Sequence, residues 1–269
     1  MSRAAGDASV FSAYGSGRRK VVVFGIPSLG RVSLRFLEAH YRLAQPTNAS
    51  VIHVYCEGKP VAEARNQIVA QALAFDDGER EVTHVFFLDD DVLPHSEAFK
   101  KLAADGRDVV AGLYYLKTAV PTPMVLMDDG DGVARSWVPG ELVECSAHGM
   151  GLTLVRAEVF RRMRDETDIG TDEFGLPAWF RTLKDQRVLT PQGHEAHVNE
   201  TEDVYFLRRA RSLGYRPCVD TSAQAFGWHW AQAEQRAYPL KQWAEYVRTR
   251  RVTWDADAGG PPVVWEQVA

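Results

Sequence analysis

The sequence predicts an α/β protein in which helices flank an open, mixed β-sheet. Apolar segments rich in β-branched residues alternate with segments of helical periodicity in the first half of the chain, as parallel strands with right-handed crossovers require. Short strands and a glycine-rich turn follow, so part of the sheet should be antiparallel. Hydrophobic residues make up 45% of the 269 residues and charged residues 25%, a composition that can bury a sizeable core.

The first half of the chain alternates between strands and helices. The first strand, KVVVFGI, stops at Pro27-Ser28, and apolar residues at three- and four-residue steps then indicate a helix that ends before Pro46. The most apolar strand, VTHVFFL, runs directly into Asp89. The expected elements are strand 20–26, helix 29–41, strand 51–55, helix 61–75, strand 82–88, a short helix from 94 to about 106 and strand 109–115.

The second half is less regular. An Asp-Asp-Gly-Asp-Gly turn between apolar runs predicts a hairpin over residues 121–137, and the long stretch 165–200 is expected to be irregular. The other expected elements are strands 142–145 and 152–155, helix 157–164, helix 201–213, strand 215–219, an aromatic segment at 226–230 and helix 240–249.

The charge balance and the cysteines exclude several classes of protein. Lys and Arg total 31 and Asp and Glu total 36, so the net charge of −5 provides no global positive field for nucleic acid or anionic membranes. Residues 1–20 contain no run that resembles a signal sequence, and no segment reaches membrane-spanning length, which predicts a cytoplasmic protein. Cys56, Cys145 and Cys218 are odd in number and lack CxxC spacing, so buried, reduced thiols are expected.

Three consecutive carboxylates, Asp89, Asp90 and Asp91, follow the most apolar strand. Because they repel one another, a cation, hydrogen bonds or shifted pKa values must compensate for their proximity. Alternation along the strand places Asp89 and Asp91 on one side, where they could hold Mg²⁺ or Mn²⁺ at the edge of the sheet where α/β proteins bind ligands. The alternative is a solvated turn whose acids cap the next helix.

The run VFFLDDDVLP resembles the Asp-x-Asp segment of GT-A glycosyltransferases, especially the compact ones related to the large family-two group and common in bacteria and their phages. Further segments are similar to other elements of these enzymes and occur in the same order between residues 20 and 230. They are Ala64-Arg65-Asn66, Gly149-Met150-Gly151, Thr201-Glu202-Asp203 and Phe226-Gly227-Trp228-His229. The resemblance implies a GT-A type sheet with a Rossmann-like nucleotide-binding half and an acceptor half.

The resemblance implies a metal-dependent transfer of a sugar from a nucleoside-diphosphate sugar, with UDP-sugars expected, to an acceptor hydroxyl. Asp89, Asp91 and His229 would hold the metal, and this mixed oxygen and imidazole set favours Mn²⁺ over Mg²⁺. For His229 the alternative is simple packing between Trp228 and Trp230.

The resemblance also assigns residues to the donor. Asp89 and Asp90 would contact the nucleotide, and Arg65 would reach a phosphate or the base. The remaining candidates for the donor site are Pro27, Ser28, Asn66 and Lys117. For Arg65 and Lys117 a solvated surface position is the alternative, and Asn66 could instead bond the backbone locally.

On the acceptor side, the resemblance makes Asp203 the general base and Glu202 the residue that orients the acceptor, if the reaction inverts the anomeric centre. A retaining enzyme would use the same pair to bind the acceptor, and both acids also suit the first turn of a helix after Thr201. Gly149 and Met150 would shape the acceptor site, and Trp179 and Phe180 would stack on a sugar or base. His194 and His197 are expected to be loop histidines.

The expected organisation is a flexible tail at 1–19, a single catalytic domain at 20–235 and a C-terminal helix and tail at 236–269 that packs on or near the acceptor site. The acceptor stays open between a glycan, a small molecule, a protein and a modified DNA base. Two alternatives remain for the function. Asp89-Asp90-Asp91-Val92 also resembles the Asp-x-Asp-x-Val motif of phosphohydrolases of the haloacid dehalogenase type, although that motif belongs after the first strand. A non-catalytic nucleotide-sugar-binding module fits the same fold.

Overall fold

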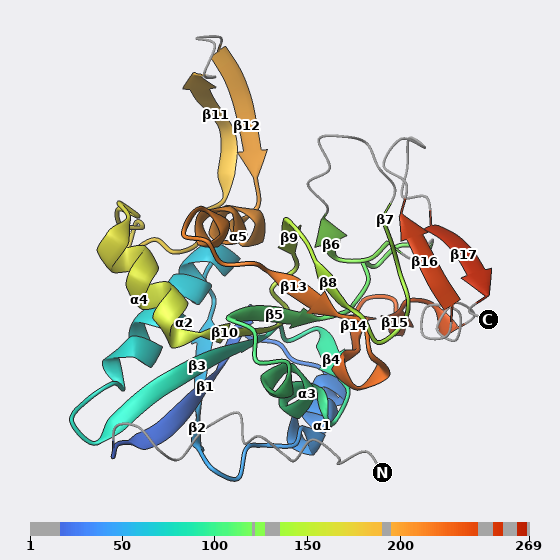
Figure 1. Cartoon of the computed structure of the whole chain (residues 1–269), viewed down its shortest axis with the longest axis horizontal. Coiled ribbons are helices and arrows are strands. Elements are labelled where there is room, and N and C mark those ends of the chain that lie inside the picture. Colours follow the sequence, from blue (N-terminus) through green and yellow to red (C-terminus); the bar gives the residue numbers. More distant parts are fainter. Residues whose placement is uncertain are drawn as a thin grey trace, which may run out of the picture.

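The computed structural model describes residues 17–119, 122–126, 135–189, 195–241, 250–254 and 263–267. The strands of its central sheet are β1 Arg19–Ser28, β2 Ser50–Glu57, β3 Arg80–Leu88, β5 Val109–Gly112, β8 Leu142–Glu144, β10 Leu152–Arg156 and β13 Cys218–Asp220. Their order across the sheet is β2-β1-β3-β10-β5-β13-β8 (Figure 1). Strands β10 and β8 run against the other five. The predicted open, mixed α/β sheet is therefore confirmed.

Helices cover both faces of this sheet (Figure 1). They are α1 Leu34–Arg42, α2 Val61–Ala74, α3 Ala98–Ala104, α4 Ala157–Glu166 and α5 Glu202–Ser212, with a 3-10 turn η1 at Ala223–Ala225. The first of them starts later than predicted because Ser33 caps it, its Oγ accepting a hydrogen bond from the Phe36 backbone N–H at 3.0 Å.

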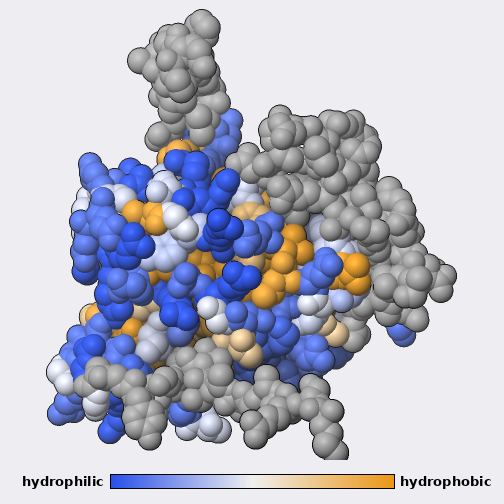
Figure 2. Space-filling model, in the orientation of Figure 1, coloured by the Kyte–Doolittle hydropathy of each residue, from blue (hydrophilic) through white to orange (hydrophobic). Residues whose placement is uncertain are grey.

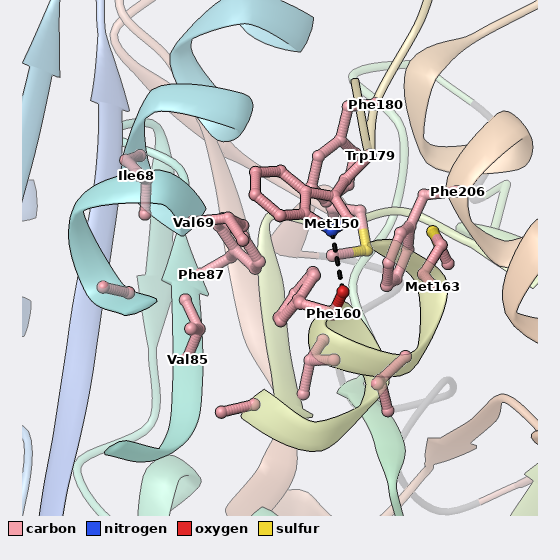
Figure 3. Close-up of a cluster of buried hydrophobic side chains, with 14 of the residues drawn as sticks. Ile68, Val69, Val85, Phe87, Met150, Phe160, Met163, Trp179, Phe180 and Phe206 are labelled. Atoms are coloured by element: carbon pink, nitrogen blue, oxygen red, sulfur yellow. Dashed lines mark hydrogen bonds between the residues drawn. The ribbon is translucent and has the colours of Figure 1, made fainter. Parts of the chain in front are cut away.

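Alternation along the strands divides the core into two layers. Val85 and Phe87 of β3 point to the face covered by α2, α4 and α5, whereas Phe86 and Leu88 point to the face covered by α1 and α3. Figure 3 shows the first layer, with side chains from α2, β3, α4 and α5 packed together and the Trp179 indole N–H donating to the Phe160 carbonyl at 2.9 Å. All three cysteines are free and buried, as predicted.

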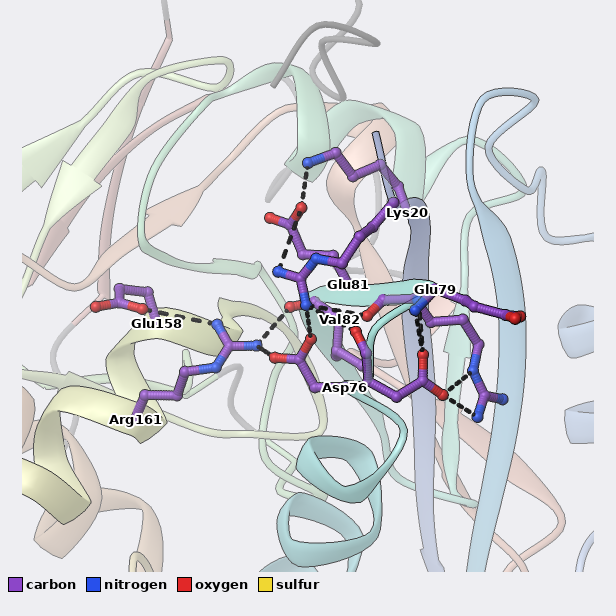
Figure 4. A network of polar contacts seen from close by, with 10 residues as sticks. Lys20, Asp76, Glu79, Glu81, Val82, Glu158 and Arg161 are labelled. Atoms are coloured by element: carbon purple, nitrogen blue, oxygen red, sulfur yellow. Dashed lines mark hydrogen bonds and ion pairs between the residues drawn. The ribbon is translucent and has the colours of Figure 1, made fainter. Parts of the chain in front are cut away.

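Polar contacts fasten α4 and β1 to the start of β3. Arg161 of α4 donates to the Asp76 carboxylate and to the Val82 carbonyl of β3, the latter at 2.9 Å, and Lys20 of β1 pairs with Glu81 at 2.6 Å (Figure 4). This network lies at the start of β3, at the opposite end of the strand from the carboxylates Asp89 to Asp91. It therefore stabilises the layers without contributing to the carboxylate cluster.

The predicted hairpin over 121–137 is wrong. Strand β6 (Val125–Leu126) pairs with β9 (Ala147–His148), and β7 (Arg135–Trp137) pairs with β16 (Arg250–Trp254), which also pairs with β17 (Val263–Gln267). Residues 127–134 lie outside the described residues. The sequence pattern of a turn is local, whereas β6 and β7 each pair with a strand from another part of the chain.

The stretch expected to be irregular also contains regular structure. Strands β11 (Leu183–Leu189) and β12 (Glu195–Glu200) form an antiparallel ribbon that projects from the body just before α5 (Figure 1). The candidate His194, most of the expected tail 1–19 and nearly all of the expected helix 240–249 lie outside the described residues.

A second, smaller sheet lies next to the carboxylates Asp89 to Asp91, which directly precede its strand β4 (Val92–Pro94). It contains β4, β14 (Gly227–Ala231) and β15 (Arg236–Tyr238) in the order β15-β14-β4. The described residues on the face in Figure 2 are mostly hydrophilic, with apolar residues gathered across the middle. Among the helices whose residues are described, none has the length and apolar character needed to cross a membrane.

Candidate functional site

The three consecutive carboxylates lie in the turn that joins β3 to β4. The Asp89 backbone N–H donates to the Gly151 carbonyl at 3.0 Å, and the Val92 N–H donates to the Asp89 carbonyl at 3.0 Å. These bonds hold the turn at the C-terminal end of β3, where α/β sheets bind ligands. Each carboxylate then takes a different partner.

Asp91 meets His229 and Lys117. Because β14 pairs with β4 so that His229 lies opposite Val92, the imidazole Nε2 comes within 3.3 Å of Asp91 Oδ2. Lys117 Nζ lies 2.5 Å from the same oxygen. Burial alone would raise the pKa of Asp91, but its interactions with His229 and Lys117 outweigh burial and lower the pKa to about 2. Asp91 is therefore a carboxylate at neutral pH.

The ring of His229 has a fixed orientation. Its Nδ1 lies 3.0 Å from the Tyr115 carbonyl oxygen, which can only accept, so Nδ1 carries the hydrogen. In the neutral imidazole, Nε2 then directs a lone pair towards the Asp91 carboxylate, an arrangement that needs a cation or a proton between the two groups. A carbonyl that orients a histidine in this way is the usual second partner of a metal-binding imidazole.

These two residues fit a divalent cation, but they do not complete its coordination. Among the described residues, no group of three or more His, Cys, Asp or Glu side chains is arranged as a ready metal site. Asp91 and His229 would supply one oxygen and one nitrogen, and Lys117 now provides the positive charge beside Asp91. Further ligands would have to come from a bound anion and from water.

Asp89 belongs to a different group of charges. Arg65 of α2 donates from Nη2 to both Asp89 oxygens, at 2.9 and 3.0 Å, and from Nη1 to the Glu202 carboxylate. Burial raises the pKa values of Asp89 and Glu202, while the Arg65 charge opposes that rise. Burial would lower the pKa of Arg65, but Asp89 and Glu202 outweigh burial and raise it. Arg65 is 2% exposed, so its guanidinium is positioned to hold these two acids rather than to meet solvent.

Glu202 and Asp203 form the first turn of α5, as the sequence predicts. Asp203 Oδ1 accepts hydrogen bonds from the Thr201 hydroxyl and from the Val204 backbone N–H, the latter at 2.8 Å. Because Arg65 bridges Glu202 and Asp89, the adjacent Asp203 also lies near the end of β3. The structure thus brings Asp89, Arg65, Glu202 and Asp203 together.

Asp90 faces an open cleft that Asp91 and Lys117 also line. The Ser28 hydroxyl at the end of β1 donates to Asp90 Oδ2 at 2.6 Å, and burial raises the pKa of Asp90. The cleft has a volume of about 540 Å³ and lies between the β1–α1 loop, Asp90, Asp91, Lys117 and the segment from Trp230 to Gln232. This volume suits a ligand the size of a nucleotide.

Several candidate residues lie in the core instead. Trp179, Phe180 and Met150 are each about 1% exposed, so they are not available to stack on an acceptor in this arrangement, which corrects the sequence-based interpretation. Asn66 is fully buried, where its amide bonds the Phe180 backbone at 2.9 and 3.1 Å and Asp172 at 3.2 Å. It joins α2 to the segment before β11 rather than facing the cleft. Pro27 lies inside β1, next to Ser28.

The glycine segment packs against the site. An added Cβ would lie 2.1 Å from the Tyr114 hydroxyl at Gly149 and 2.8 Å from Asp89 Oδ2 at Gly151. The same hydroxyl accepts a hydrogen bond from the Gly151 N–H at 3.0 Å. These glycines therefore allow β10 to approach Asp89 closely, a structural role that the sequence did not reveal.

Sequence reasoning missed two residues of this region. Tyr114 is buried between the glycine segment and Asp89, and burial raises its pKa well above the usual value. Arg31 lines the cleft from the β1–α1 loop. Neither residue matched a motif, although a charged residue in the loop after the first strand was a signal that could have indicated Arg31.

The central sheet is open and mixed, with helices on both faces. No protein-family model and no curated protein matches the chain. Among solved structures, the chain is similar to A197 from STIV, with 19% identity and a TM-score of 0.48 over 93% of this chain and 95% of that one. It is also similar to TarS 1-349 from S. aureus, with 16% identity and a TM-score of 0.36 over 78% of this chain and 59% of that one.

Proposed function

We propose that the chain is a metal-dependent glycosyltransferase that moves a sugar from a nucleoside-diphosphate sugar, such as a UDP-sugar, to an acceptor hydroxyl. The observation that carries this proposal is the pairing of Asp91 with a carbonyl-oriented His229 beside an open cleft at the end of β3. Such a pair supplies oxygen and nitrogen ligands where a negatively charged leaving group would be bound.

The metal would be held by Asp91 Oδ2 and His229 Nε2, a mixed set that favours Mn²⁺ over Mg²⁺. When bound, it neutralises charge that develops on the departing diphosphate. Asp89 directs both of its oxygens to Arg65, so it is the weaker candidate for a ligand.

The cleft suits the donor. Lys117 and Arg31 line it and provide positive charge for a diphosphate. Ser28 at the end of β1 donates to Asp90, which lines the cleft from the β3–β4 turn. With a metal bound to Asp91, the Lys117 ammonium would be free to bind a phosphate oxygen. Lys117 and Arg31 would stabilise the leaving diphosphate as its negative charge grows.

The acceptor reaction would use the first turn of α5. In an inverting transfer, the acceptor hydroxyl attacks the anomeric carbon, its proton passes to the Asp203 carboxylate, and the bond to the diphosphate breaks with its electrons. Glu202, fixed by Arg65, would orient the acceptor. Among the described residues, Asp203 accepts hydrogen bonds from Thr201 and Val204, both on Oδ1, which leaves Oδ2 for this proton.

The geometry disfavours the phosphohydrolase alternative. That reaction needs an aspartate nucleophile with a free oxygen, but Arg65 engages both oxygens of Asp89. A non-catalytic binding module would use the same site. A turnover assay distinguishes it from an enzyme.

The test is a panel of nucleotide sugars with Mn²⁺, read by melting temperature and by release of the nucleoside diphosphate. One nucleotide class should raise the melting temperature and be hydrolysed slowly, since water can replace the acceptor. Asp91→Asn should abolish both effects, whereas Asp108→Asn, which changes an exposed carboxylate paired with Arg156 away from the cleft, should retain them. Full activity of the wild type in chelator-treated buffer would contradict metal dependence, and binding without turnover would favour the binding module.

A further inference from the structure

The side chain of Arg65 connects two parts of the site that are far apart in sequence. It lies on α2, and its two terminal nitrogens reach Asp89 at the end of β3 and Glu202 at the start of α5. Asp89 lies on the donor side of the proposed reaction, next to the Asp90 and Asp91 turn, and Glu202 precedes the candidate base Asp203. One buried guanidinium thus joins the two halves.

We infer that Arg65 is a positioning residue: it ties Glu202, and with it the start of α5 and Asp203, to Asp89, and so sets the distance between the general base and the metal-binding turn. This inference rests on the proposed function and makes its acceptor chemistry depend on a residue that touches neither substrate. It also differs from the sequence-based expectation that Arg65 binds the donor.

Burial and geometry support this role. Arg65 is 2% exposed, and the cleft is lined by other residues, so its guanidinium does not face the space where a donor would bind. The two acids are partly buried and carry like charges, so without a cation between them they would repel each other in a weakly screened environment. Arg65 is the group that holds them together.

Asp89 and α2 are each held in place by contacts that do not involve Arg65. Asp89 is held by its backbone bond to Gly151, and α2 is fastened through the two hydrogen bonds between Asn66 and the Phe180 backbone. Among the described residues, the hydrogen bonds at the start of α5 other than the Arg65 contact are local. Thr201 and Val204 donate to Asp203, and the Tyr205 N–H donates to the Thr201 carbonyl. Loss of Arg65 should therefore displace α5 rather than Asp89 or α2.

The fork of the guanidinium is essential to this geometry. Arginine presents donors in a planar arrangement that can serve two carboxylates at once, whereas a lysine ammonium is a single point charge. Arg65→Lys should therefore keep the charge balance but lose one of the two attachments. Arg65→Gln should lose the charge as well.

The experiment compares wild type, Arg65→Lys, Arg65→Gln and the control Arg161→Gln. Arg161 is a partly buried arginine that ties α4 to β3, but at the far end of the strand. For each protein, kcat and donor KM are measured with the nucleotide sugar found above, together with the affinity for Mn²⁺ and nucleoside diphosphate. Hydrogen exchange is followed in the peptide that covers residues 201–206.

We expect kcat to fall roughly tenfold in Arg65→Lys and on the order of 100-fold in Arg65→Gln, because small displacements of a catalytic group have effects of this size. Donor KM and nucleotide affinity should stay within about threefold of wild type, since the donor contacts are unchanged. Exchange at 201–206 should accelerate in both Arg65 variants. Arg161→Gln should lower the melting temperature but leave kcat, KM and this exchange unchanged.

Two results would overturn the inference. A rise in donor KM with unchanged kcat would show that Arg65 binds the donor directly, and unchanged exchange at 201–206 in Arg65→Gln would show that it does not hold α5. If the wild type turns over no nucleotide sugar, the proposed function fails, but the exchange experiment still decides whether Arg65 fixes the start of α5.

Discussion

At the scale of single residues, neighbouring carboxylates have separate partners. Strand alternation predicts Asp89 and Asp91 on one side, but both lie in the turn after β3, where Asp89 pairs with Arg65 and Asp91 with His229 and Lys117. Both partners of Asp91 and the partner of Asp89 come from other elements, so only the folded chain could divide the cluster in this way. The division leaves Asp91 as the carboxylate best placed to hold a cation.

Asp203→Asn should separate catalysis from binding. The amide keeps the local hydrogen bonds at the start of α5 but cannot take a proton, so turnover should fall on the order of 100-fold while donor affinity stays unchanged. Turnover, donor affinity and melting temperature are measured on the same variant. If the acids serve only as first-turn residues, the variant will show wild-type turnover and at most a small loss of stability.

At the scale of the elements, α2 is more than a cover for the sheet. Its buried face carries Arg65 and Asn66 side by side, one holding the acids of the site and the other holding the backbone of Phe180. The helical pattern placed both residues on α2 correctly, but it could not show that both are buried. Their polar side chains are tolerated in the core because each finds partners there.

Asn66→Ala should destabilise the protein by about 2–4 kcal/mol, because it leaves the buried N–H and C=O of Phe180 without their partner. Chemical unfolding measures this loss. The neighbouring Gln67→Ala, on a less buried position of the same helix, should change stability by less than about 0.5 kcal/mol. Equal effects of the two substitutions would show that the Phe180 contacts contribute little.

At the scale of the whole molecule, buried titratable groups couple stability to pH in opposite directions. Lys101 and Asp105 of the α3 region meet Asp220 of β13, and burial raises the pKa of Asp105 to about 6. Burial lowers the pKa of His84 to about 3 and that of His148 to about 4. Both histidines have a pKa of about 6.5 in the unfolded chain, so the folded protein loses stability as the pH falls below that value.

Asp105 acts in the other direction. The folded protein binds its proton more tightly than the unfolded chain does, so its contribution is complete below about pH 4 and is lost as the pH rises through about 6. In Asp105→Asn, the amide can donate to Asp220 at every pH. The stability of this variant relative to wild type should therefore increase between pH 4 and pH 7, by an amount on the order of 3 kcal/mol.

Unfolding by denaturant at several pH values, on wild type and Asp105→Asn in parallel, measures this difference. Because the histidines are the same in both proteins, their contribution cancels. Parallel pH profiles for the two proteins would contradict a raised pKa of Asp105 in the folded protein.

The sequence alone determined the fold class, most of the elements up to residue 119 and the residues of the β3–β4 turn. It could do so because strand and helix periodicity is a local pattern, and because three acids after an apolar strand are unusual in any fold. It also placed Glu202 and Asp203 in the first turn of a helix, where backbone N–H groups favour acids.

The tertiary structure decided which of these residues meet. The pairing of Asp91 with His229 depends on β14 pairing with β4, and the connection from Asp89 to Glu202 depends on an arginine from α2. It also decided that Trp179 and Phe180 lie in the core, and that β6 and β7 pair with distant strands rather than with each other. The physical reason is the same in each case: burial and pairing depend on elements far apart in the chain, which local periodicity does not record.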